Sequence, residues 1–311
     1  MKAKTIWIKV VIAVFLLIYL IKSGQIDFSL LTISASIKFH VTGLILVTSC
    51  LLIQVFRWWI LMKLQGFSLS IRYALWLSWV GFFISLPLPG MAGGILSRAY
   101  LIAKDVSSQD RVRAIYTVVF DRVIGLFALL CMGAGALCYA VIQHGWDWRL
   151  ESIWLSIVIL FSAILIFFTM LCSGKLRQLA IRFLPTSLGE PLGVIVGACR
   201  HHMLLVTIAL FISLLSGTVT MGAFMVAGGS IGEKVSWNET FQVVPLVFVA
   251  GTLPIAPDGI GVSESAASLL FSQYGIASGA TIMLVYRLWM LLIRLPGSLL
   301  FIFCKVKPAA S

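Results

Sequence analysis

A straight apolar helix cannot continue through the stretch Leu86-Pro87-Leu88-Pro89-Gly90-Met91-Ala92-Gly93-Gly94, because proline lacks a backbone N–H and glycine readily leaves the helical conformation. A second stretch repeats the pattern: Leu253-Pro254-Ile255-Ala256-Pro257-Asp258-Gly259-Ile260-Gly261. These two breaks interrupt apolar segments at about residues 73–96 and 240–262. In lipid, the backbone groups freed at a break must face protein or a wet cavity. We therefore expect two re-entrant elements, the alternative being two packed spans with simple kinks.

The composition indicates that a bilayer surrounds this chain. Of its 311 residues, 60% are hydrophobic and 11% are charged, and the mean hydropathy is +1.07, whereas soluble domains carry about 25% charged residues. The sequence therefore predicts an all-α polytopic membrane protein without room for a soluble catalytic domain. About six full transmembrane helices are expected from apolar runs of near-crossing length, at about residues 6–21, 40–63, 114–142, 151–172, 203–228 and 279–303.

The basic residues predict the orientation of the spans. With the N-terminus in the cytoplasm, fifteen of the 23 lysines and arginines lie on the inner side, four on the outer side and four within spans. This distribution obeys the positive-inside rule, provided that each broken segment enters and leaves on one side. The C-terminus is then cytoplasmic as well. Topology explains most of the net charge of +12, so no nucleic-acid partner is expected.

The same series of elements surrounds each break. It consists of a span, the break, a short helix and a span that bears an arginine. The residue pairs that mark the two series are Ser97-Arg98 with Asp121-Arg122, and Ser263-Glu264 with Tyr286-Arg287. By the charge distribution the breaks open to opposite sides, which predicts an inverted-topology repeat and a transport site near the midplane. We expect a single integral membrane domain over residues 1–311, made of a first helix and outer loop (1–39), a first repeat (40–142), a linking helix and cytoplasmic amphipathic segment (143–202) and a second repeat (203–311).

Charged residues at membrane depth are candidates for headgroup binding or gating, because a charge at the bilayer centre costs about 3 kcal/mol on insertion scales. The expected ion pairs join the two repeats: Asp121 with Arg287, and Glu264 with Arg98 or Arg122. Arginines outnumber acids within the spans, which leaves positive charge for an anionic headgroup; the alternative is that closed ion pairs hold the fold. The candidate site residues are Arg57, Arg98, Asp121, Arg122, Asp258, Glu264, Tyr286 and Arg287.

Some basic residues have simpler interpretations. Arg57, beside Trp58 and Trp59, could be an interface anchor whose guanidinium group snorkels outward, and Arg294 is expected to snorkel in the same way. The segments 97–113 and 174–200 interleave basic and apolar residues. This pattern is typical of a helix on an anionic leaflet or of a connecting helix packed on the bundle.

These residues resemble the transmembrane domain family of lysylphosphatidylglycerol synthases, also called the flippase-like family, over about residues 5–304. The resemblance implies a multi-pass protein of a bacterial or archaeal cytoplasmic membrane. In some members this domain moves an aminoacylated phospholipid between leaflets, and other members stand alone and are linked to export of hopanoids or lipid-linked glycans. The segments that carry the resemblance are Arg57-Trp58, Leu86-Pro87 with the glycine-rich stretch to Ser97-Arg98-Ala99, Asp121-Arg122, Pro257 to Glu264, and Tyr286-Arg287-Leu288.

The bifunctional members of that family carry a soluble aminoacyl-transferase domain after the membrane part. This chain ends seven residues past Cys304, so we expect a stand-alone member that does not synthesise lipid. The charged positions of the family carry over as Arg98, Asp121, Arg122, Glu264 and Arg287.

The leading functional hypothesis is a flippase-like translocator of a phospholipid or lipid-linked headgroup, without ATP hydrolysis because no phosphate-binding loop is present. The alternative is a proton- or ion-coupled secondary transporter of a soluble anion, with Asp121 or Glu264 carrying the proton. A membrane enzyme would need a nucleophile or metal cluster, and the scattered serines, histidines and cysteines form none. We expect no enzymatic activity, cofactor or metal; the expected partners are membrane lipids, and a homodimer is left open.

Overall fold

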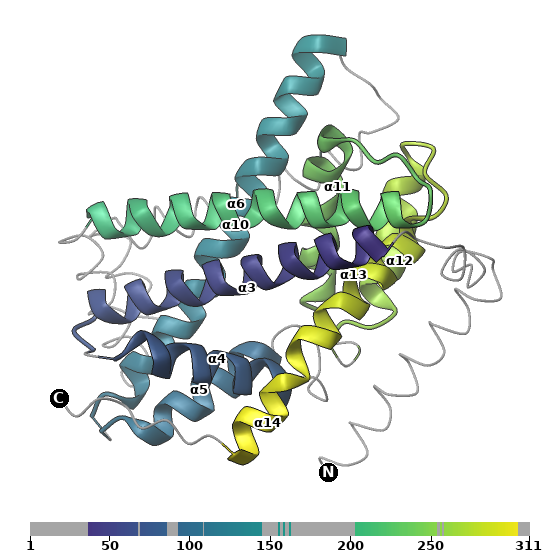
Figure 1. Cartoon of the computed structure of the whole chain (residues 1–311). Helices are drawn as coiled ribbons and strands as arrows, with labels where there is room; N and C mark the ends of the chain where they lie inside the picture. The colour runs from purple at the N-terminus through teal and green to yellow at the C-terminus, as the bar shows by residue number, and fades with distance from the viewer. Residues whose placement is uncertain are drawn as a thin grey trace.

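The computed structural model describes residues 37–67, 69–85, 93–107, 109–144, 203–253 and 258–303, with the single positions 155, 158, 162 and 256. Within these residues every regular element is an α-helix, which confirms the predicted all-α class (Figure 1). Several predictions fall outside the described residues. They concern the span at 6–21, nearly all of the span at 151–172, the segment at 174–200, and the break residues Pro87, Pro89, Gly90, Pro254 and Pro257.

Four helical stretches are long and apolar enough to cross a membrane: Ile37–Leu64, Arg111–Ala136, Val206–Ser230 and Gly279–Ile302. They coincide with four of the six predicted crossings, and the other two crossings fall on residues outside the described ranges. The stretches belong to α3 (Ile37–Leu64), α6 (Arg111–His144), α10 (Met203–Ser230), and α13 (Gly279–Arg294) together with α14 (Pro296–Phe303).

Shorter helices flank the two breaks: α4 (Ile71–Ile84), α5 (Gly93–Asp105), α11 (Trp237–Gly251) and α12 (Val262–Ser272). At 1.5 Å per residue, α4 is about 21 Å long, well short of the hydrocarbon thickness. The hydroxyl of Ser70 accepts a hydrogen bond from the Tyr73 N–H and so caps α4, and Ser236 and Glu239 form a capping box at α11. One helix therefore ends before each predicted break, and another begins close to its end.

The described helices repeat one order. A long helix, a short helix, a break, a second short helix and a long helix occur as α3 to α6 and again as α10 to α13. We call these two sets the first and second series. In each, the two short helices pack on one another, and the second short helix packs on the long helix that follows.

The two series meet along α3 and α10, which lie side by side (Figure 1). A Cβ atom placed on Gly229, near the end of α10, would lie 2.9 Å from the ring of Phe39, near the start of α3. Arg57, near the end of α3, hydrogen-bonds to Ser213 in the first half of α10. The two helices therefore run in opposite directions.

Apolar side chains form one cluster in each series. Trp58, Tyr73 and Leu77 are fully buried in the first cluster. In the second cluster, Phe224 stacks on Tyr286 with ring centroids 4.6 Å apart. Because α3 contributes to both clusters, it connects the two series through apolar packing as well as through its contact with α10.

A further contact joins α4 of the first series to the end of the second. The indole N–H of Trp79 donates to the Ile293 carbonyl at 3.0 Å, and that of Trp76 donates to the Leu300 carbonyl at 3.2 Å. Gly297 allows this approach, since a Cβ atom there would lie 2.5 Å from the Trp79 carbonyl oxygen. The Ile293 carbonyl lies close to the junction of α13 and α14, where Pro296 cannot donate to the helix ladder, and Leu300 lies in the last turns of α14.

Candidate functional site

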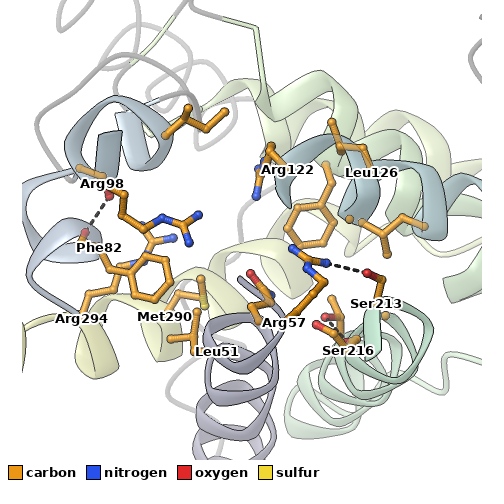
Figure 2. A pocket seen from close by; sticks show the side chains of 18 of the residues that line it. Leu51, Arg57, Phe82, Arg98, Arg122, Leu126, Ser213, Ser216, Met290 and Arg294 are labelled. Carbon is orange, nitrogen blue, oxygen red and sulfur yellow. Dashed lines mark hydrogen bonds between the residues drawn. The ribbon is translucent and has the colours of Figure 1, made fainter. Parts of the chain in front are cut away.

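A cavity of about 100 Å³ lies between the two apolar clusters and is lined by both series (Figure 2). One water molecule needs roughly 10–15 Å³, so several waters or a small polyatomic group fit inside. Its charged lining residues are Arg57, Arg98, Arg122, Asp258 and Arg294. Positive side chains therefore outnumber negative ones in the lining.

Asp121 on α6 is the acid that two of these arginines share. It is 1% exposed, and its carboxylate accepts a hydrogen bond from Arg57 Nε at 2.7 Å. Arg98 Nη1 lies 3.8 Å from the other carboxylate oxygen. Arg57 also donates from Nη1 to the Ser213 hydroxyl at 2.9 Å. The interface-anchor interpretation of Arg57 is wrong, because α3, α6 and α10 enclose its guanidinium group and supply its partners.

Gly125 provides the space that the Arg57 guanidinium group occupies. A Cβ atom at this position would lie 2.9 Å from Arg57 Nη1 and 3.1 Å from Nη2. The arginine cannot easily move aside, because Asp121 and Ser213 hold it on its other edges.

We expect Gly125→Ala to disrupt the ion pair between Arg57 and Asp121 without unfolding the protein. The methyl group displaces Arg57 from Asp121, while alanine favours a helix over glycine by about 1 kcal/mol and so offsets the strain. The matched control is Gly135→Ala on the same helix, where a Cβ atom would meet nothing within 4 Å. Structures and thermal unfolding of both variants test this; an Arg57–Asp121 pair that is unchanged in Gly125→Ala would contradict it.

Arg98 on α5 lies between aromatic rings of two neighbouring helices. Its guanidinium carbon is 5.4 Å from the centre of the Phe82 ring and 5.9 Å from that of Trp58. Such contacts favour a cation within a dry environment. Arg98 and Arg122 extend toward the middle of the cavity from opposite sides (Figure 2).

In the second series, Glu264 lies in the first turn of α12 and binds the backbone at the end of the break. It is fully buried, and its Oε2 accepts a hydrogen bond from the Gly261 N–H at 2.7 Å. The backbone φ angles of Asp258, Gly259 and Gly261 are +46°, +70° and +82°. A side chain at Gly259 would meet the Gly251 carbonyl oxygen at 2.8 Å, so the close return of the chain requires glycine at that position.

Arg287 on α13 satisfies the exposed backbone of the same break. Its guanidinium group forms an ion pair with Glu264. It also donates to the carbonyls of Asp258 and Gly259, at 3.0 and 3.3 Å. A broken helix in a bilayer is tolerated when protein groups bind the freed carbonyls, and Arg287 performs this task here.

Asp258 connects the break to the cavity through a second arginine. Arg294 Nη1 donates to Asp258 Oδ2 at 2.8 Å, and Arg287 Nη1 lies 3.5 Å from the same oxygen. Arg294 is only 8% exposed. The expectation that it snorkels to the interface is therefore wrong, because the carboxylate of the break provides a partner within the protein.

The predicted ion pairs between the series are also wrong. Asp121 contacts Arg57 and Arg98 instead of Arg287, and Glu264 contacts Arg287 instead of Arg98 or Arg122. The physical reason is packing within each series: α12 lies directly on α13, and α3 on α6. Five of the predicted site residues nevertheless line the cavity, namely Arg57, Arg98, Arg122, Asp258 and Tyr286.

Sequence reasoning missed the polar lining contributed by α10. Ser213, Ser216, Gly217 and Thr220 all line the cavity. Their spacing of three and four residues places them on one face of a helix, a signal present in the sequence. Single small polar residues in an apolar span are easily overlooked, because their hydroxyls can bond to their own helix. Those of Ser213 and Thr220 do so, at 2.7 and 2.9 Å.

The comparisons with known proteins identify a family and no individual relative. The sequence model described as the lysylphosphatidylglycerol synthase TM region matches residues 6–297. That region is the non-catalytic part of those synthases. No curated protein and no solved structure matches the chain.

Proposed function

The chain belongs to the family of lysylphosphatidylglycerol synthase TM regions, and we propose that it translocates a phospholipid or a lipid-linked headgroup across a bacterial or archaeal cytoplasmic membrane without ATP hydrolysis. The observation that carries the proposal is the arginine-rich cavity between two helix series in a multi-pass membrane protein. A polar headgroup crossing hydrocarbon must exchange its hydration for protein groups. Buried arginines in a cavity large enough for several waters offer such groups.

We further propose that the two series form an inverted-topology repeat, with the two breaks as re-entrant elements entering from opposite sides. The repeated order of helices and the opposite directions of α3 and α10 support this arrangement. So do the lengths of the short helices, which fall short of a full crossing. Six full spans with both termini in the cytoplasm complete the proposed topology.

The location of the ion pairs suits movement between the series. Asp121 binds arginines of the first series, whereas Glu264 and Asp258 bind arginines of the second. Each acid therefore keeps its arginine partners when the two series shift relative to one another. The cavity lies between them, so such a shift would change its access in the manner of other inverted-repeat transporters.

Reconstitution into liposomes tests translocation directly. The purified chain is placed in vesicles that carry trace phospholipids labelled on the acyl chain with a fluorophore, and dithionite is added outside. In protein-free vesicles only the outer leaflet loses its fluorescence, whereas translocation exposes the inner leaflet as well. If no lipid class moves while the protein is folded and inserted, the proposed function is wrong.

A second candidate function is ion-coupled transport of a soluble anion, favoured by the small volume of the cavity, about 100 Å³. It predicts that proteoliposomes accumulate a water-soluble anion and that the uptake collapses with the proton gradient. In this case Asp121 or Glu264 must release its arginine to bind a proton. Solute uptake without lipid movement would select this function.

A further inference from the structure

The cavity has two chemically different walls. The first, which we call the arginine wall, consists of Arg98 and Arg294 from α5 and α13, and Arg122 on α6 faces Arg98 from the opposite side (Figure 2). The second, which we call the polar wall, consists of Gln54, Ser213, Ser216 and Thr220 from α3 and α10. A ligand that fills the cavity therefore meets arginines from more than one side and small polar groups of α3 and α10.

We infer that the cavity binds the phosphodiester of an anionic lipid on the arginine wall and the hydroxyl groups of its uncharged headgroup on the polar wall. This inference rests on the proposed function and names its substrate class. Guanidinium groups match phosphate oxygens in geometry as well as in charge.

The charge balance favours an anion. Among the described residues at and around the cavity, five arginines face three carboxylates: Arg57, Arg98, Arg122, Arg287 and Arg294 against Asp121, Asp258 and Glu264. In a medium of low dielectric constant an excess of arginines over acids attracts an anion strongly. A phosphodiester entering the cavity reduces this surplus, whereas a lipid of net positive charge increases it.

A buried hydrogen-bond donor on the arginine wall also favours an anionic ligand. Arg294 binds Asp258 through Nη1. Its Nε atom is buried and has no hydrogen-bond partner within the described part of the chain. Burial of a charged donor without a partner is costly, and a phosphate oxygen near this atom would remove that cost.

The polar wall is built mainly of groups that can accept hydrogen bonds. The hydroxyls of Ser213 and Thr220 donate to carbonyls of α10, which commits their hydrogens. Each hydroxyl oxygen has two lone pairs, so these oxygens can take hydrogen bonds from a ligand. Ser213 receives one from Arg57, and Cys50 lies 3.1 Å from the Thr220 oxygen. The accepting oxygens of the polar wall favour a ligand that donates hydrogen bonds, such as the hydroxyls of glycerol or a sugar. An ammonium group would also donate, but the excess of arginines around the cavity disfavours its positive charge.

The first experiment compares lipid classes in the unmodified protein. Proteoliposomes receive one acyl-labelled probe at a time: phosphatidylglycerol, phosphatidylmethanol, phosphatidylcholine or phosphatidylethanolamine. We expect phosphatidylglycerol to move at least about tenfold faster than the two zwitterionic lipids, and several-fold faster than phosphatidylmethanol, which has the same charge without the hydroxyls. Equal rates for all four probes would leave the proposed function standing and overturn this inference.

A pair of variants on α10 tests the polar wall. Thr220→Val removes a hydroxyl from the cavity with little change of volume and should reduce the preference for phosphatidylglycerol over phosphatidylmethanol. Thr218→Val is the matched control, because Thr218 is exposed and its hydroxyl likewise bonds to its own helix. If Thr220→Val keeps the full preference for phosphatidylglycerol, the assignment of the polar wall is wrong.

Inorganic phosphate and glycerol phosphate distinguish a lipid from a soluble ligand of the same chemistry. Present on both sides of the membrane, they should slow translocation of phosphatidylglycerol by competing for the arginine wall. Uptake of radiolabelled phosphate, with no lipid movement, would keep the phosphate site but overturn both the lipid assignment and the proposed function. If neither anion slows translocation even at high concentration, the assignment of a phosphate site to the arginine wall is wrong.

Discussion

Glu264→Ala is expected to destabilise the protein by about 3–5 kcal/mol, the typical cost of removing one partner from a buried ion pair. Glu264 is fully buried, binds Arg287 and caps the Gly261 N–H at the start of α12. Its loss leaves Arg287 with a reduced set of partners and opens the end of the break. Thermal unfolding of the purified protein, or the fraction that remains monodisperse after heating, measures the effect.

Glu239→Ala provides a matched control for that measurement. Glu239 occupies the equivalent third position of α11 and accepts a hydrogen bond from the Ser236 N–H at 2.7 Å, but it is only partly buried. Its removal should cost only the loss of a cap, about 1 kcal/mol. Glu264→Gln keeps an oxygen that can bind the Gly261 N–H and should fall between the two. If both alanine variants lose the same stability, the buried ion pair is not what holds the second break.

Arg122→Gln is expected to reduce translocation of phosphatidylglycerol by about 10- to 100-fold while the protein still folds. A hydrogen bond to a charged group contributes about 1.5–3 kcal/mol, which corresponds to that range. Arg122 lies in the cavity where arginines outnumber acids, so removing its charge relieves repulsion and should not unfold the chain. Initial rates in proteoliposomes measure the loss.

Arg113→Gln is the control for Arg122, because Arg113 lies on the same helix and contacts Gln65 and Phe67 outside the cavity. It should retain translocation. Arg122→Lys keeps the charge but loses the paired donors of the guanidinium group, so it should recover part of the rate. If Arg122→Gln translocates phosphatidylglycerol as fast as Arg113→Gln, the headgroup does not depend on this side of the cavity.

The positions of the spans and breaks could be predicted because they follow from local properties of the chain. Hydropathy located α3, α6, α10 and α13, since a helix must be apolar over the thickness of the bilayer. Proline and glycine located both breaks, since they restrict the backbone wherever they occur. The repeated series was visible for the same reason, as a matter of order along the sequence.

The partners of the charged residues could not be predicted in this way. Which arginine meets Asp121 depends on how α3 and α6 are rotated and packed, and the sequence specifies these only through the whole core. Gly125 illustrates the point: in the sequence it is one more small residue in a span, and only the structure shows that its missing side chain makes room for Arg57. The polar wall of α10 has a helical spacing, but nothing along the chain shows which face of α10 lines a cavity.

By itself, the sequence determined that this is a helical membrane protein with two matched breaks and too many arginines at membrane depth, because hydropathy, backbone restriction and charge act locally. The tertiary structure alone decided that the acids are bound within their own series and that four arginines line a cavity between the series. Ion pairing and cavity shape depend on distances between helices far apart in the chain, and packing sets these distances.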